Sequence, residues 1–154
     1  NKEEAYRLTI TPKAITVEAV AERGVYWAMQ TLYQLKEEKG KKIRLQCATI
    51  TDWPAFRIRG FMQDVGRSYL SLEELKREIA ILSRFKINTF HWHLTENQAW
   101  RLESKIFPML NDSTNMTRMA GKYYTLEEAP ESMQQWIREY KILQYYMLFD
   151  GQES

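Results

Sequence analysis

The sequence predicts an α/β protein, with a small ββαβ layer followed by strand–helix units of a parallel sheet. Three observations lead to this fold class. Apolar and polar residues alternate over 6–20 and 42–54, which is typical of strands. Apolar residues recur at helical spacing over 24–38 and 72–86. The run 87–94 has few polar interruptions, as expected for a strand that is covered on both faces.

The first 54 residues form the predicted ββαβ layer. Alternation on either side of Pro12 predicts a β-hairpin over 6–20. A helix over 24–38 is expected to end at Gly40, after a lysine-rich last turn. Its predicted buried face consists of Val25, Ala28, Met29, Leu32 and Leu35. The charged run 36–42 is interpreted as a solvated helix end and loop.

Alternation resumes over 42–54 and stops at Pro54, so this run predicts the last strand of the layer. A turn around 52–55 then marks the expected domain boundary. We therefore predict two domains, 1–54 and 55–154.

The second domain begins with a predicted strand–helix–strand unit. A strand over 55–66 is followed by Ser71 and Glu74, whose spacing is that of a capping box. The helix then runs to about Lys86, and a second strand covers 87–94. Its expected buried face consists of Leu72, Leu75, Ile79, Leu82 and Phe85. Two strands joined by such a helix are expected to pair in parallel with a right-handed crossover.

The rest of the chain continues the alternation of helix and strand after a long loop over 95–125. A further helix is predicted with Pro130 in its first turn. Its expected buried face consists of Met133, Trp136, Ile137 and Tyr140. One more strand is predicted over 141–149.

Composition excludes several classes of partner. The formal net charge of +2 gives no reason to expect binding to nucleic acid or to an anionic membrane. No stretch approaches the roughly 20 apolar residues of a membrane span. Cys47 is the only cysteine, so an intrachain disulfide is impossible. The first ten residues contain no apolar signal-peptide core, and the compartment is not determined by the sequence.

Polar residues follow both predicted parallel strands, at the ends where α/β proteins bind ligands. Asp64, Gly66 and Arg67 follow the first strand, and Thr95 to Trp100 follow the second. This coincidence is the first functional signal in the sequence.

The residues of this cluster allow more than one interpretation. His91 and His93 are two apart on a strand, a spacing that suits metal ligation, but the chain has no third histidine and packing inside a barrel fits better. Arg67 could bind hydroxyls, carboxylates or phosphates, or form an ion pair with Asp64. Glu96 could be a general acid, an orienting group or a loop carboxylate that accepts backbone N–H bonds.

Residues 59–110, "RGFMQDVGRSYLSLEELKREIAILSRFKINTFHWHLTENQAWRLESKIFPML", resemble family 20 glycoside hydrolases, the β-N-acetylhexosaminidases. The order R-G-x-x-x-D-x-x-R, amphipathic helix, K-x-N-x-x-H-x-H-L-T and Q-x-W-R carries the resemblance. Residues 4–54 also resemble the small α/β domain that precedes the barrel in that family.

The resemblance implies the first βα units of an incomplete (β/α)8 TIM barrel and a hydrolase that removes terminal N-acetylglucosamine or N-acetylgalactosamine. In this family the 2-acetamido oxygen of the substrate attacks the anomeric carbon. An aspartate orients the acetamido group, and an adjacent glutamate protonates the leaving oxygen. No cofactor and no metal are implied, and family members are often secreted, periplasmic or lysosomal.

Each residue of the cluster has a counterpart in the family. Arg67 matches the arginine that hydrogen-bonds the hydroxyls of the terminal sugar. Glu96 matches a position that most often holds an aspartate, linked through a histidine to the catalytic acid. Asp64, His91 and His93 match positions on the rim of the sugar site.

The last residues depart from the family pattern. The run 141–154, "KILQYYMLFDGQES", lacks the P-E-I-D-x-P-G-H motif, and the catalytic Asp-Glu pair is expected beyond the chain. We therefore expect a truncated, inactive piece whose partner is an N-acetylhexosamine-terminated glycan, bound weakly. A stand-alone carbohydrate-binding or interaction module, or a metal-dependent H-x-H hydrolase, are the alternatives. Exposure of Phe61 and Phe90 on an open sheet edge also predicts a homo-oligomer.

Overall fold

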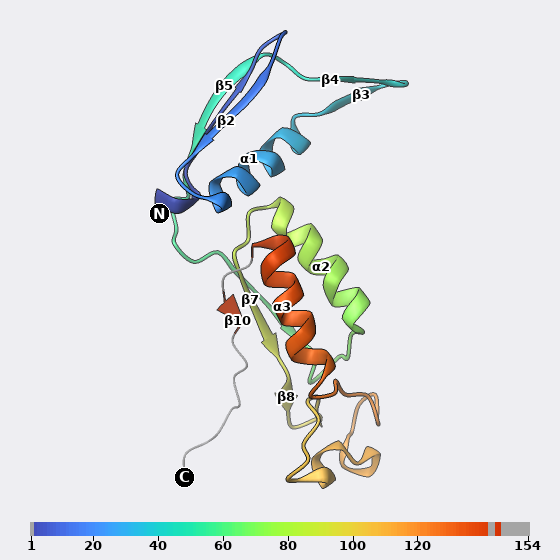
Figure 1. The fold of residues 1–154 in the computed structure, drawn as a ribbon. Coiled ribbons are helices and arrows are strands. Elements are labelled where there is room, and N and C mark those ends of the chain that lie inside the picture. The colour runs from blue at the N-terminus through green and yellow to red at the C-terminus, as the bar shows by residue number, and fades with distance from the viewer. Residues whose placement is uncertain (1, 142–143, 146–154) are drawn as a thin grey trace. The chain divides into compact units, whose positions relative to one another are not determined.

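The computed structural model describes residues 2–141 and 144–145 (Figure 1). The chain forms two compact units. The first contains Asn1–Arg59 together with Arg84–Lys86, and the second contains Gly60–Ser83 and Ile87–Ser154. No helix of the described residues is both long and apolar enough to cross a membrane.

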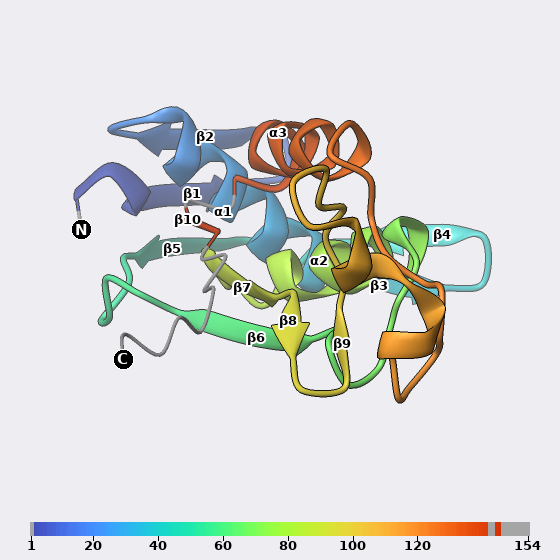
Figure 2. The ribbon, with the colours of Figure 1, turned by 90° about the horizontal axis from the view of Figure 1, so that it is seen from below.

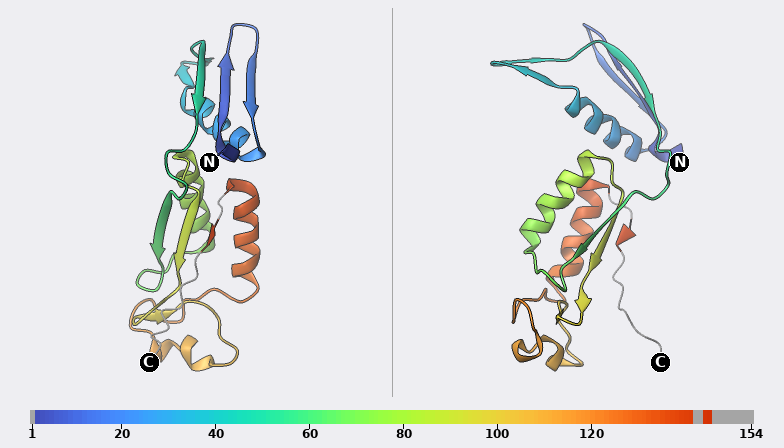
Figure 3. Two further views of the ribbon diagram at one scale, coloured as in Figure 1. Left: turned by 90° about the vertical axis from the view of Figure 1, so that its left-hand side faces the viewer. Right: turned by 180° about the vertical axis from the view of Figure 1, so that it is seen from behind.

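The first unit is a three-stranded antiparallel sheet with one helix against it. The sheet has the order β2-β1-β5, and its central strand pairs Leu8 with Val17 and with Ile50. The helix α1 lies along one face of the sheet (Figure 3). The elements of this unit are η1 (Lys2–Glu4), β1 (Tyr6–Ile10), β2 (Ile15–Ala19), α1 (Glu22–Gln34), β3 (Glu37–Lys39), β4 (Lys42–Arg44) and β5 (Ala48–Asp52).

The end predicted for the first helix is wrong. Helix α1 ends at Gln34, and the charged run 36–42 contains most of a short antiparallel hairpin, β3–β4, rather than a helix end. Gly40 stands at the turn of this hairpin with a φ of 64°. That left-handed conformation is easy for glycine, so Gly40 turns a hairpin here instead of stopping the helix.

The buried face of α1 is also rotated from the predicted one. Trp27 and Ala28 are buried, whereas Val25 and Met29 are 43% and 49% exposed. A Cβ on Gly24 would lie 2.5 Å from the carbonyl oxygen of Ala5, so α1 closely approaches the backbone just before β1. The close approach therefore selects the face that carries the small residue, and the larger Val25 and Met29 turn outward.

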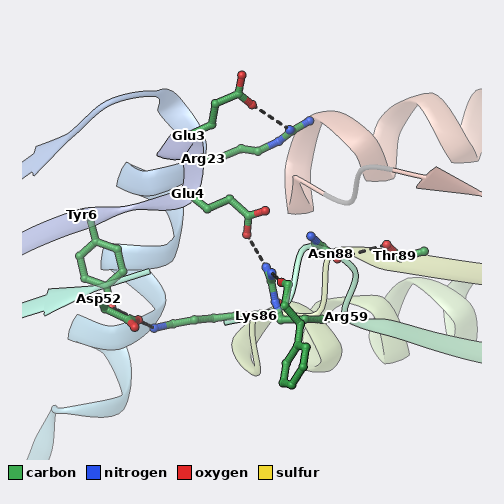
Figure 4. A network of polar contacts seen from close by, with 10 residues as sticks. Glu3, Glu4, Tyr6, Arg23, Asp52, Arg59, Lys86, Asn88 and Thr89 are labelled. Atoms are coloured by element: carbon green, nitrogen blue, oxygen red, sulfur yellow. Dashed lines mark hydrogen bonds and ion pairs between the residues drawn. The ribbon is translucent and has the colours of Figure 1, made fainter. Parts of the chain in front are cut away.

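Two ion pairs connect segments of the first unit that are distant in the sequence (Figure 4). The buried carboxylate of Glu4 accepts a hydrogen bond from Arg59. The Nζ atom of Lys86 donates to Oδ2 of Asp52 at 2.7 Å and to the Tyr6 hydroxyl at 2.9 Å. Burial alone would raise the pKa of Asp52, but the hydrogen bonds from Lys86 and Tyr6 hold it below its ordinary value.

The second unit is built on parallel strands. Strand β7 pairs in parallel with β6 on one side and with β10 on the other. The elements are β6 (Gly60–Asp64), α2 (Leu72–Arg84), β7 (Thr89–His93), β8 (Thr95–Glu96), β9 (Ala99–Trp100), η2 (Pro108–Asn111), η3 (Ser113–Asn115), α3 (Glu128–Tyr140) and β10 (Gln144–Tyr145). The predicted strand–helix–strand unit is confirmed, and so is Pro130 in the first turn of the next helix. Of the strand predicted over 141–149, only the pairing at β10 can be described, and residues 142–143 and 146–149 lie outside the described residues.

The capping box predicted at the start of α2 is present. The Ser71 hydroxyl accepts a hydrogen bond from the Glu74 backbone N–H at 3.3 Å. In return, the Glu74 carboxylate accepts from the Ser71 backbone N–H at 2.7 Å. A second box of the same kind joins Thr125 to Glu128 at the start of α3. Each box satisfies N–H groups that the first helical turn leaves without a partner.

Helices α2 and α3 cover the same side of the β6–β7 sheet (Figure 3). Phe90 and Trp92 are buried on this side, and the Trp92 ring lies 5.4 Å from that of Trp136 in α3. The exposure expected for Phe90 is therefore wrong, because the residue faces the helices, while Phe61 is 37% exposed. Phe85 is 72% exposed, since α2 ends one residue before it and releases it from the helix face.

Replacing Ser71 with alanine is expected to lower the free energy of unfolding by about 0.5–2 kcal/mol, the usual cost of losing an N-cap. Urea unfolding followed by circular dichroism would measure the difference. Ser68→Ala is the matched control, because Ser68 is an exposed loop residue nearby. Equal stability of the Ser71→Ala and Ser68→Ala variants would contradict the capping role.

Candidate functional site

The parallel register places the ends of β6 and β7 next to each other. Asp64, the last residue of β6, is paired with His93, the last residue of β7. The β8–β9 hairpin lies beyond these strand ends, with η2 and η3 near it (Figure 2). The polar segments that follow the two strands in the sequence therefore meet at one edge of the sheet.

Arg67 lies between two carboxylates from different strand ends. Its Nε atom is 3.2 Å from Oδ2 of Asp64, and its Nη2 atom is 2.7 Å from Oε1 of Glu96. The Arg67 backbone N–H also donates to Asp64 at 3.1 Å. The guanidinium itself stays open to solvent, with 58% of the side chain exposed. It is thus fixed in direction while remaining accessible.

Gly66 allows the loop after β6 to approach the β8–β9 hairpin, which contains Glu96. A Cβ at this position would lie 2.7 Å from the Cβ of Glu96 and 3.2 Å from its backbone nitrogen. Real Cβ atoms essentially never show a contact as short as 2.7 Å, so any larger residue would push Glu96 away from Arg67. The sequence showed this glycine in the cluster, and its role is evident only from the geometry.

Glu96 is held in its ionised form. Its Oε2 atom accepts a hydrogen bond from the Asn97 backbone N–H at 3.0 Å, and its Oε1 atom faces Arg67. The Asn97 N–H and then the Arg67 guanidinium lower the pKa of this carboxyl below its ordinary value. Of the three interpretations that the sequence left open, the geometry favours a loop carboxylate that orients Arg67. A general acid would need a raised pKa instead.

The two histidines lie on the face of β7 opposite Trp92, as their spacing predicts. Their ring centroids are 5.7 Å apart. Burial, and then the neighbouring His93, lower the pKa of His91, so its neutral form is favoured. The Nε2 atom of His93 is 3.7 Å from Oε1 of Glu96, so His93 touches the cluster and His91 lies behind it.

A metal centre is not the arrangement that these groups favour. Ligand atoms of Asp64, His93 and Glu96 lie within 4.8 Å of one another, so the closest grouping does not use the H-x-H pair. Both carboxylates already face the Arg67 guanidinium. A metal ion bound there would have to displace the guanidinium from both carboxylates, and the loss of these ion pairs opposes binding.

Arg101 is a structural centre that the sequence interpretation missed, although the motif Q-x-W-R contains it. The side chain is completely buried. Its Nε atom donates to the Val65 carbonyl at 2.9 Å and its Nη2 atom to the Gly66 carbonyl at 3.2 Å. The same guanidinium donates to the carbonyls of Arg118, Met119 and Lys122, at 2.8 to 3.0 Å. Burial lowers the pKa of Arg101, yet no ion pair among the described residues includes it.

Solved structures define the class of protein to which this fold and site belong. The X-ray structure of the chitobiase from Flavobacterium johnsoniae matches with a TM-score of 0.82 and 34% identity, covering 91% of this chain and 21% of that one. The exo-β-N-acetylglucosaminidase of Vibrio harveyi, solved in complex with N-acetylglucosamine, matches with a TM-score of 0.78 and 32% identity, covering 93% and 25%. The fold is therefore that of glycoside hydrolases, and the predicted fold class, which begins a (β/α)8 barrel after a small α/β layer, is confirmed.

Family models give the particular assignment. The model of the catalytic domain of glycosyl hydrolase family 20 matches residues 56–142, and the model of domain 2 of the same family matches residues 1–53. The chain belongs to glycosyl hydrolase family 20. This confirms the resemblance drawn from the sequence motifs.

Curated relatives agree with this assignment. The β-hexosaminidase of Porphyromonas gingivalis is 40% identical over 146 residues, which cover 86% of this chain and 19% of the relative. That of Vibrio furnissii is 37% identical over 143 residues, covering 84% and 23%. The chain thus spans about a fifth of the length of these relatives.

Replacing Arg67 with methionine is expected to raise the pKa of Glu96 toward the ordinary glutamate value, because one of the three groups that stabilise the carboxylate is lost, while the Asn97 N–H and His93 remain. Carboxyl carbon NMR across a pH titration would measure this. The ion pair between Arg67 and Glu96 stabilises the folded state at pH values above the ordinary glutamate pKa. This stabilisation is lost as the pH falls through the lowered pKa that Glu96 has in the folded protein. Arg118→Met, at an exposed position, is the control, and an unchanged Glu96 pKa in Arg67→Met would contradict the contact.

Proposed function

We propose that the cluster around Arg67 binds the terminal N-acetylhexosamine of a glycan, in a protein that hydrolyses β-N-acetylhexosaminides. The single observation that carries the proposal is the Arg67 side chain, exposed to solvent yet directed by two carboxylates at the end of the first barrel strand. The names of the relatives, β-hexosaminidases, support the substrate class.

The charge of the cluster favours a neutral sugar over an anion. Asp64 and Glu96 together outweigh the single positive charge of Arg67, so a phosphate or carboxylate ligand would be repelled. Vicinal hydroxyls suit the site better, because they accept hydrogen bonds from the guanidinium and donate to the neighbouring carboxylates. The Nη1 atom of Arg67 takes part in none of the hydrogen bonds among the described residues, so it is the donor we assign to the sugar.

In the proposed reaction, the substrate's acetamido oxygen attacks the anomeric carbon and displaces the leaving group. An aspartate that orients the acetamido group and a glutamate that protonates the leaving oxygen are needed. We assign neither role to Asp64 or Glu96, because both carboxylates face Arg67 and Glu96 has a lowered pKa. The part of this chain in the reaction is to bind the sugar ring and fix its orientation.

Residues 1–154 alone are expected to bind N-acetylglucosamine with a dissociation constant of about 1 mM or weaker, because few groups contact the sugar. A dissociation constant of about 1 mM corresponds to a binding free energy of about 4 kcal/mol. Titration followed by NMR would measure it. Arg67→Ala should abolish binding, and Arg138→Ala, at an exposed position on α3, should leave it unchanged. Binding that is tighter than this and survives Arg67→Ala would contradict the proposal.

The same polypeptide is expected not to hydrolyse an aryl N-acetylglucosaminide at an enzymatic rate. General acid catalysis typically supplies a factor of about 10²–10⁴, and neither Glu96 nor Asp64 is placed to provide it. A chromogenic assay on protein freed of contaminating hexosaminidase would test this, with Arg67→Ala and Glu96→Gln as controls. Sustained turnover that either substitution abolishes would show that the chain holds a complete site.

A further inference from the structure

We propose that Arg101 is the positioning residue that directs Arg67 toward the substrate. Arg101 is completely buried, so it cannot contact a sugar itself. It acts through the backbone of the two residues that immediately precede Arg67. What the directed side chain then binds rests on the function proposed above, whereas the positioning itself does not.

The guanidinium of Arg101 fixes the peptide groups on which the direction of Arg67 depends. Its Nε and Nη2 atoms hold the carbonyls of Val65 and Gly66, which point inward. The Val65 N–H is held from the other side by the His93 carbonyl at 3.0 Å. With the two preceding peptide groups held in this way, the backbone that enters Arg67 is fixed, which restricts the direction in which its side chain projects.

The main chain of Arg101 ties this arrangement to the next strand. Its backbone N–H donates to the Leu94 carbonyl at 2.9 Å, and its carbonyl accepts from the Tyr124 N–H at 2.8 Å. Arg101 therefore links the end of β7, through its backbone, to the loop after β6, through its side chain. The two carboxylates that hold Arg67 come from these two strand ends, so Arg101 also sets their separation.

A further loop surrounds the guanidinium on its remaining side. The carbonyls of Arg118, Met119 and Lys122 accept its other N–H groups. Met119 has a φ of 42°, in the left-handed region that residues other than glycine rarely adopt. The turn at 118–122 thus takes an unfavourable conformation and presents its carbonyls to Arg101.

Lysine could not replace arginine in this position. The planar guanidinium has five N–H donors in a fixed geometry, and here they reach carbonyls on two separate loops. A lysine has three donors at one point, and its charge would be buried with fewer partners. Arg101→Lys therefore keeps the positive charge and removes the planar arrangement of N–H donors.

The test uses the chain without sugar and follows by ¹⁵N NMR the side-chain Nη2–H group of Arg67, which donates to Oε1 of Glu96. In Arg101→Lys, hydrogen exchange of this group is expected to rise about tenfold, as for the loss of one hydrogen bond to a charged group. Its chemical shift should move toward that of a free arginine. Arg138→Lys, at an exposed position on α3, is the matched control and should leave both quantities unchanged. An unchanged Arg67 signal in folded Arg101→Lys would overturn the proposal.

A second measurement covers the case in which Arg101→Lys does not fold. In the unmodified chain, warmed in steps below the global unfolding transition, the Nε–H group of Arg101 and the Nη2–H group of Arg67 should lose protection together. Continued protection of Arg67 after Arg101 has exchanged would overturn the coupling. A titration with N-acetylglucosamine separates the two proposals: a chain that shows the coupled signals yet binds no sugar contradicts the proposed function alone.

Discussion

The parallel pairing of β6 with β7 is the constraint on which the rest of the second unit depends. Because Asp64 is in register with His93, both strands end at the same level and their loops leave the sheet side by side. A shift of this register by one residue would turn the two strands' side chains to opposite faces. Phe90 and Trp92 would then leave the core under α2 and α3, and the cluster at the strand ends would separate.

Two arginines lie at these strand ends, one exposed to solvent and one buried. Arg67 is exposed, and carboxylate side chains set its direction. Arg101 is buried, and backbone carbonyls, together with the Met116 sulfur, receive its hydrogen bonds among the described residues. The contrast follows from solvation: a buried guanidinium must satisfy its donors inside the protein, whereas an exposed one can keep donors free for a ligand.

Strong local patterns in the sequence were enough to predict the hairpin, the capping box at Ser71 and the helix that contains Pro130. Predictions failed where distant residues decide the outcome. The face of α1 depends on the approach of Gly24 to Ala5, and the burial of Phe90 depends on helices that pack on it. At the candidate site, the order of the sequence motifs predicted that Arg67 and Glu96 are site residues. The carbonyls that surround Arg101 come from segments that no periodicity connects, so their convergence was not predictable.

The two arginines also differ in how they respond to ionic strength. Counterions screen exposed charges over a Debye length of about 8 Å at physiological salt and about 3 Å at 1 M. The Arg67 guanidinium is open to solvent and falls within this effect, whereas Arg101 is completely buried and its carbonyl partners are out of reach of ions. Concentrated salt is therefore expected to weaken the ion pairs of the Arg67 side chain and to leave the backbone beneath it in place. The sensitivity of this cluster to salt therefore lies in the Arg67 side chain and not in the backbone that carries it.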